Sequence, residues 1–198
     1  LGGTVDQLRS ALCRLWRLPW ENATKEPFWR LIYNAHPTAA RLHRQDSCPC
    51  GAAVPDRSHH YWACPVAQAV RAAIDACLAA AAPHAPPTQQ PQIWLALAPA
   101  GVHVGVWDVV CLAAVRAMDR GRRALIRETL FQPQPQPADP AALVARCGQA
   151  ACGHFWSCLY DFVAHRRLPA GWQHCPPGHP FIYYDPAAQM LVVNRHPQ

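Results

Sequence analysis

Apolar side chains recur at helical spacing along most of the chain, which predicts a mainly helical fold. The first such segment covers residues 5–18 and ends at Pro19, because proline removes a backbone donor from a helix. A second segment covers residues 25–34. A third begins at Pro65, which suits the first position of a helix, and its apolar stripe comprises Val66, Val70, Ile74 and Leu78.

The second half of the chain repeats this pattern in longer segments. Residues 104–130 carry the most regular apolar stripe, in which Gly121 is a candidate break. Another helix opens at Pro140 and extends to about residue 165. Two β-rich runs, residues 181–184 and 190–193, flank a turn and predict a small C-terminal hairpin.

Proline-rich segments divide the chain into two helical regions. Residues 1–82 form the first region, which includes an irregular cysteine-rich stretch at 45–65. Residues 83–92 read PHAPPTQQPQ and predict a linker. Residues 93–198 form the second region, with a Pro-rich loop at 132–138 and the hairpin at its end. No apolar run reaches the ~18–20 residues that a transmembrane helix requires.

Composition and charge narrow the classes of partner. The chain has 198 residues, of which 51% are hydrophobic and 15% charged, and its formal net charge is +6. Arginine supplies 17 of the 18 basic residues, and its planar donor fork suits phosphate. This balance permits a nucleic-acid partner, although codon bias in a GC-rich genome also explains an arginine excess. Because the chain begins at Leu1, we expect a processed protein, a fragment or the ordered part of something longer.

One cluster of cysteine and histidine has the composition of a metal site. Cys48 and Cys50 flank a proline and precede a glycine, and His59 and Cys64 follow within the same short segment. Three thiolates and one imidazole match a closed tetrahedral Zn²⁺ shell, which leaves no open position for catalysis and makes the metal structural. His60 competes with His59 for the fourth position. The expected fold class is therefore a mainly α helical domain with one zinc knuckle and a small C-terminal β-hairpin.

Other cysteines and histidines are more typical of a helical core. One set lies within a predicted helix, and another surrounds a Pro-Pro-Gly turn that can bind metal only adventitiously. We expect the first set to be buried free thiols and their neighbours rather than a second zinc site. The two sets are Cys147, Cys152, His154 and Cys158, and His174, Cys175 and His179.

The knuckle and its surroundings resemble a known family. FWRLIYNAHPTAARLHRQDSCPCG followed by HHYWACPVAQAV is similar to the zinc-binding segment that follows the polymerase in non-LTR retrotransposon reverse transcriptases. LWRLPWENATKEPFWRL, VWDVVCLAAVRAMDRGRRAL and LPAGWQHCPPGHPF resemble the C-terminal tail of such elements in green algae. The resemblance implies that Cys48, Cys50, His59 and Cys64 are metal ligands and that the chain holds RNA.

The catalytic parts of that family are missing from this sequence. Tyr-x-Asp-Asp is absent, and Tyr183-Tyr184-Asp185-Pro186 offers one carboxylate where two metals need more. Lys25 is the sole lysine, and no paired acids accompany it as an endonuclease would require. We therefore expect a chain without enzymatic activity.

Nucleic-acid contacts are expected from arginines on both sides of the knuckle and in the long helix. The tryptophans are expected in the core rather than as platforms for stacking bases. Solvated faces and helix C-terminal charges are the alternative explanation for the arginines. The candidates are Arg41, Arg44, Arg57, Arg120, Arg122, Arg123 and Arg127.

These observations and the resemblance together predict a function. We expect a non-catalytic, zinc-binding, RNA-binding protein: a domesticated reverse-transcriptase tail that is a structural component of a ribonucleoprotein. The particle expected is an organellar ribosome, with the mitochondrion favoured over the nucleus or cytoplasm. Its partners would be ribosomal RNA and neighbouring proteins, with no membrane and no small-molecule substrate. The alternatives are a nucleic-acid-binding fragment of a retrotransposon reverse transcriptase and a zinc-stabilised protein-interaction module.

Overall fold

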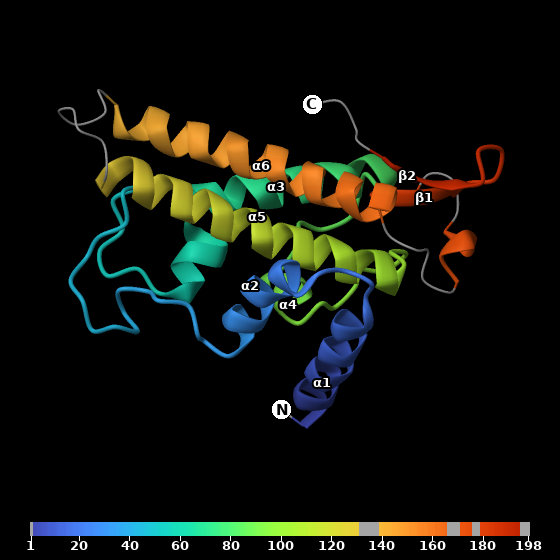
Figure 1. The fold of residues 1–198 in the computed structure, drawn as a ribbon, viewed down its shortest axis with the longest axis horizontal. Helices are drawn as coiled ribbons and strands as arrows, with labels where there is room; N and C mark the ends of the chain where they lie inside the picture. The colour runs from blue at the N-terminus through green and yellow to red at the C-terminus, as the bar shows by residue number, and fades with distance from the viewer. Residues whose placement is uncertain (1, 131–138, 166–170, 176–178, 195–198) are drawn as a thin grey trace.

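The computed structural model describes residues 2–130, 139–165, 171–175 and 179–194. These residues form a mainly helical fold with a two-stranded antiparallel hairpin near the C-terminus (Figure 1). The elements are α1 (Gly2–Arg17), α2 (Asn22–Ile32), η1 (His59–Ala63), α3 (Pro65–Ala81), α4 (Gln90–Trp94), α5 (Val104–Leu130), α6 (Pro140–His165), η2 (Trp172–His174), β1 (Ile182–Asp185) and β2 (Met190–Val193). The fold class predicted from the sequence is confirmed, and the segment predicted at 104–130 is helical throughout.

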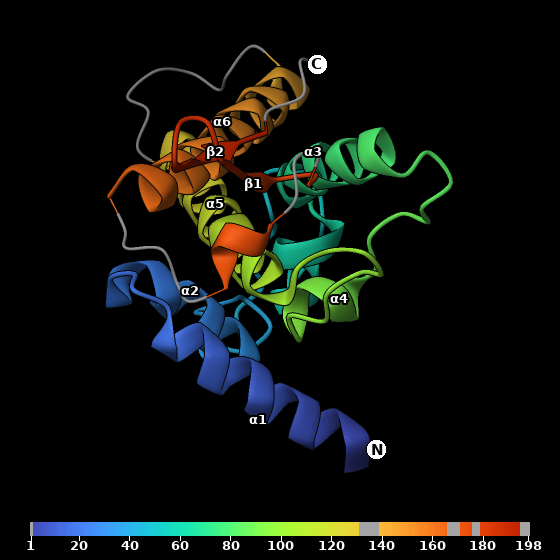
Figure 2. The same cartoon turned by 90° about the vertical axis from the view of Figure 1, so that its right-hand side faces the viewer.

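Helix α5 is the central element of the fold. It packs against α6 and α3 on one side and against α2, α1 and η1 on the other. Figure 2 shows α1 and α2 below α5, with α3 and α6 above it. Its apolar stripe is fully buried, including Trp107, Val110, Val115 and Met118. Because both sides of α5 are covered, elements from the two ends of the chain share one hydrophobic core.

The candidate break at Gly121 does not interrupt α5. A Cβ at this position would lie 2.6 Å from Val66 Cγ1 of α3 and 2.8 Å from Ala151 Cβ of α6. Glycine is therefore required for the close approach of three helices, and its helical backbone is maintained by the packing. The expectation of a break was wrong because tertiary contacts outweigh a propensity penalty of about 1 kcal/mol.

The segment 83–92, which the sequence predicts to be a linker, is helical at its C-terminal end. Its last residues already belong to α4, which begins at Gln90 and carries a capping box between Gln89 and Gln92. Trp107 of α5 donates its indole N–H to the Gln92 carbonyl at 2.9 Å, and Ile93 is buried. The segment therefore docks onto the core at its C-terminal end. The Pro-rich loop predicted at 132–138 lies outside the described residues.

The C-terminal hairpin forms as predicted. Ile182 pairs with Val193 and Asp185 with Met190 in antiparallel register. The Asp185 carboxylate accepts hydrogen bonds from the backbone N–H groups of Ala187 and Ala188, which stabilises the turn. Strand β2 packs against α6, so the hairpin extends the core at one end of the helices.

None of the helices in the described ranges is both long enough and apolar enough to cross a membrane.

The close helix crossing at Gly121 generates a prediction about stability. Gly121→Ala places a methyl group against rigid neighbours, and overpacking of this kind lowers the free energy of unfolding by about 1–3 kcal/mol. Gly153 in α6 is the matched control, because a Cβ there has no atom within 4 Å. Gly153→Ala raises stability by about 0.5–1 kcal/mol through helix propensity. Urea unfolding followed by circular dichroism measures both, and equal stability changes in the two variants would contradict the packing argument.

Candidate metal centre and the adjoining cavity

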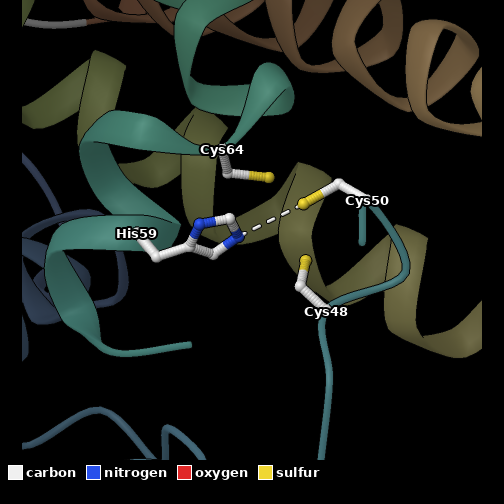
Figure 3. A group of neighbouring side chains, drawn as sticks. All are labelled: Cys48, Cys50, His59 and Cys64. Atoms are coloured by element: carbon white, nitrogen blue, oxygen red, sulfur yellow. Dashed lines mark hydrogen bonds between the residues drawn. The ribbon is translucent and has the colours of Figure 1, made fainter. Parts of the chain in front are cut away.

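Four side chains predicted to bind metal converge on one point. The ligand atoms of Cys48, Cys50, His59 and Cys64 all lie within 4.8 Å of one another. Figure 3 shows the three sulfurs and the His59 ring directed toward a common centre, with His59 Nε2 3.3 Å from Cys50 Sγ. Cys48 and Cys64 are buried. These residues lie close together and can hold a metal ion.

A tight turn presents the first two cysteines. The Gly51 N–H donates to the Cys48 carbonyl at 2.8 Å, and the Cys48 N–H donates to the Ala52 carbonyl at 2.7 Å. Gly51 has a φ of 97°, a conformation that glycine adopts without steric penalty. The turn brings the two sulfurs to the same side of the loop, and this local geometry explains the short Cys-x-Cys spacing.

A single wide helical turn presents the other two ligands. The Cys64 N–H donates to the His59 carbonyl at 2.6 Å, across five residues, which closes the π-helical turn η1. The Asp56 carboxylate accepts the His59 N–H at 2.7 Å and so starts this turn. Cys64 then leaves in an extended conformation, and Pro65 begins α3. The wide turn is what directs His59 and Cys64 to the same point.

The turn η1 determines which of the adjacent residues His59 and His60 joins the cysteine cluster. His59 faces the three sulfurs, whereas His60 is 4% exposed and lines a neighbouring cavity. Burial lowers the pKa of His60 to about 3, with nearby Arg122 contributing, so its imidazole is neutral. His59 is therefore the fourth member of the cluster, as the sequence analysis favoured.

A buried polar network fixes the same turn to the centre of the fold. Tyr61 of η1 donates its hydroxyl proton to Asp119 of α5 at 2.7 Å, and its oxygen lies 2.9 Å from His36 Nδ1. The other nitrogen of His36 bonds the Pro27 carbonyl at 2.9 Å. All three side chains are almost fully buried. The metal-binding turn is thus tied to α2 and α5 at once.

The thiols of the cluster have unequal proton affinities. A hydrogen bond with Cys64 and burial raise the pKa of Cys48 to about 12, whereas the same hydrogen bond lowers the pKa of Cys64. Burial also raises the pKa of Cys50. The metal-free cluster therefore holds protons that a metal ion must displace.

Most of the other cysteines and histidines singled out in the sequence lie in the core, whereas His174 is exposed. No second group of three or more potential ligands occurs within the residues that the structure describes. Cys147, Cys158 and Cys175 are buried, and Cys152 lies 3.0 Å from the Ala69 carbonyl. His179 accepts the backbone N–H of His103 at 3.2 Å. The second set within α6 is thus packed among helices, as the sequence predicted.

Two of the predicted RNA-contacting arginines have structural partners. Arg57 donates to the carbonyls of Leu31 and Ile32 at 2.9 and 3.2 Å, which satisfies the C-terminal end of α2. Its guanidinium also lies 5.3 Å from the ring centroid of Trp94. Arg41 bonds the Ala35 carbonyl at 3.5 Å. These contacts give Arg57 a structural role. Neither Arg57 nor Arg41 lines the cavity described next.

The other predicted arginines gather around one cavity, with a single exception. A cavity of about 1010 Å³ lies between the C-terminal end of α5 and residues 40–56, which we call the knuckle loop. Figure 1 shows this loop and the end of α5 side by side. Its walls include Arg44, Arg122, Arg123 and Arg127, together with Arg30 of α2. Arg30 was not among the candidates, because nothing in its local sequence placed it near the knuckle. Arg120 is exposed but lies outside this cavity.

Two tryptophan rings of the N-terminal helices are exposed. Trp16 and Trp29 are 54% and 45% exposed, so the expectation that the tryptophans are core residues was wrong for these two. Trp29 packs against Tyr33 one helical turn later, with ring centroids 4.9 Å apart. Arg30, which lines the basic cavity, lies between Trp29 and Tyr33 in the sequence, whereas neither ring is part of the cavity wall.

Comparison with protein-family models, with curated proteins and with solved structures found no match.

The ligand assignment predicts the effect of removing one sulfur. Cys50→Ser lowers the bound metal from about one ion per chain to almost none, because a closed tetrahedral shell then lacks a ligand. Cys152→Ser is the matched control, since Cys152 lies outside the cluster. Elemental analysis of the purified proteins measures the stoichiometry. Unchanged metal content in Cys50→Ser would contradict the assignment.

The proton affinities predict a pH dependence of metal binding. The metal binds thiolates, and the pKa values of Cys48 and Cys50 are raised in the metal-free fold. Protonated thiols dominate below those pKa values, so metal affinity increases as pH rises. The dissociation constant for Zn²⁺ is expected to fall by about a hundredfold per pH unit between roughly pH 6 and 8. Competition with a chelating dye measures this, and a pH-independent constant would show that the thiols are not ligands.

Proposed function

We propose that this chain is a non-catalytic RNA-binding protein whose knuckle is held by a structural Zn²⁺ ion. The donor set supports zinc because three sulfurs and one imidazole nitrogen match the composition of closed structural sites. Bonds of about 2.0–2.3 Å in a tetrahedron separate the ligands by roughly 3.5 to 3.8 Å. The separations of up to 4.8 Å need only a small contraction to reach that geometry.

The observation that carries the RNA assignment is the convergence of arginines on one cavity. Residues from α2, the knuckle loop and α5 contribute five arginines and one carboxylate, that of Asp46, to its walls. A phosphate backbone supplies the negative charge that such a surface attracts. A zinc centre with three thiolates has a net charge of −1, and Glu26, Asp46 and Asp119 each pair with one of these arginines, so a net positive charge still remains.

The exposed aromatic pair supports RNA in single-stranded form. Unpaired bases stack on aromatic side chains, and each such contact contributes about 1–3 kcal/mol. Trp29 and Tyr33 present two adjacent exposed rings next to Arg30. A strand whose phosphates lie along the cavity can therefore place a base on this pair.

The biological setting that we propose follows from the resemblance rather than from the cavity. The chain is a reverse-transcriptase tail without its polymerase, retained as a structural component of a ribonucleoprotein. The particle proposed is an organellar ribosome, in the mitochondrion, with ribosomal RNA and neighbouring proteins as partners. Co-sedimentation of the chain with ribosomal subunits after RNase-free lysis tests this setting. Sedimentation with retrotransposon RNA instead would favour the reverse-transcriptase fragment.

The basic cavity predicts how RNA binding responds to charge. Arg127→Gln weakens binding of a single-stranded RNA by about two- to tenfold and reduces the salt dependence of log Kd by about one phosphate contact. Arg9→Gln in α1 is the matched control, because it removes the same charge from an exposed position away from the cavity. Fluorescence anisotropy at several salt concentrations measures both. Equal losses in the two variants would indicate a net-charge effect rather than this site.

A further inference from the structure

The cavity beside the knuckle has more donors than acceptors. Three of its arginines already have carboxylate partners: Arg30 pairs with Glu26 at 2.5 Å, Arg44 with Asp46 at 2.7 Å and Arg123 with Asp119 at 2.7 Å. Arg122 and Arg127 also line the walls. The cavity therefore retains positive charge after its internal ion pairs are formed.

Two residues that line the cavity each carry a buried nitrogen atom that has no hydrogen-bond partner in the part of the chain that the structure describes. The atoms are Nε of Arg122 and Nδ1 of His60. The two residues are 7% and 4% exposed. Leaving such a group unpaired costs about 1–3 kcal/mol, and polar groups buried in proteins are seldom left in this state.

The nearest carboxylate cannot satisfy Arg122. Asp119 Oδ1 lies 3.8 Å from Arg122 Nε, which is beyond hydrogen-bond distance. That same oxygen accepts the Tyr61 hydroxyl at 2.7 Å, and Oδ2 faces Arg123. Asp119 is therefore committed to other donors, and among the described residues Arg122 Nε has no hydrogen-bond acceptor.

The size and the other walls of the cavity restrict what can supply that acceptor. A volume of about 1010 Å³ exceeds that of a single anion and admits a phosphate with its attached sugar. Pro37, Leu42, Pro55 and Ile126 form apolar parts of the wall. An anion with several acceptor oxygens, carried on a partly apolar group, fits this combination of donors and apolar surface.

We propose that this cavity is a phosphate-binding site that receives one phosphate group of an RNA strand, with Arg122 and His60 as its buried donors. The arginine guanidinium bonds phosphate in a fork, and an imidazole N–H is a hydrogen-bond donor. The proposal rests on the RNA-binding function above and adds a defined, enclosed contact to it. A free nucleotide carries the same chemistry and is the other source of the anion.

Binding of small phosphates to the zinc-loaded wild-type chain tests the cavity directly. AMP and inorganic phosphate raise the melting temperature at constant ionic strength, because a ligand that binds the folded state stabilises it. Adenosine, which lacks phosphate, does not. Absence of a shift with both phosphate compounds would overturn the proposal.

A charge variant at the rim tests the same site without disturbing the core. Thr129 lines the cavity and is exposed on α5, so its replacement leaves the fold intact. Thr129→Glu introduces a negative charge, and we expect RNA and AMP to bind about tenfold more weakly. Thr129→Gln has the same size without the charge and is expected to change binding less than twofold. Arg122→Gln, checked for folding by circular dichroism, is expected to abolish the AMP effect.

The outcomes separate this proposal from the proposed function. RNA binding that is unaffected by Thr129→Glu and Arg122→Gln overturns the phosphate cavity while RNA binding stands. AMP binding without any RNA binding supports the cavity as a nucleotide site and overturns the RNA function. Loss of both RNA and AMP binding in Thr129→Glu, with both retained in Thr129→Gln, supports the two together.

Discussion

The buried carboxylate of Asp119 connects the candidate metal centre with the basic end of α5. Asp119 lies in the middle of α5, is 4% exposed and accepts the Tyr61 hydroxyl at 2.7 Å. Through Tyr61 it fixes the turn that presents His59, and through Arg123 it positions the basic end of α5. A charge buried this deeply is stable only with partners on several sides, so the network specifies how the knuckle docks.

The metal centre and the basic cavity share one loop. Cys48 contributes a sulfur to the cluster and also lines the cavity, and Arg44 lies only a few residues before it. Few of residues 40–56 belong to the hydrophobic core, so a bound metal ion would supply order that packing does not. The knuckle loop forms one wall of the proposed phosphate site. A metal ion that orders this loop would therefore also shape that site.

Electrostatics and packing act on different parts of the surface that we propose for RNA. The arginines at the rim are exposed, so their attraction for phosphate is long-ranged but reduced by salt. Arg122 and His60 are enclosed, so contacts to them are screened less and depend on shape. Exposed rings of Trp29 and Tyr33 add a contact that depends little on salt.

Periodicity and local spacing were enough to predict α1, α2, α3, α5, α6, the hairpin and the four clustered residues, because each depends on residues close together in the chain. The same reasoning failed at Gly121, where contacts from α3 and α6 override local propensity, and at Trp29, whose exposure depends on which helix face the core covers. Sequence spacing favoured His59 over His60, and the turn closed by the Cys64 N–H directs His59 to the cluster. The cavity was beyond sequence reasoning altogether. Its arginines come from three separate segments, and only the packing of α2, the knuckle loop and α5 brings them together.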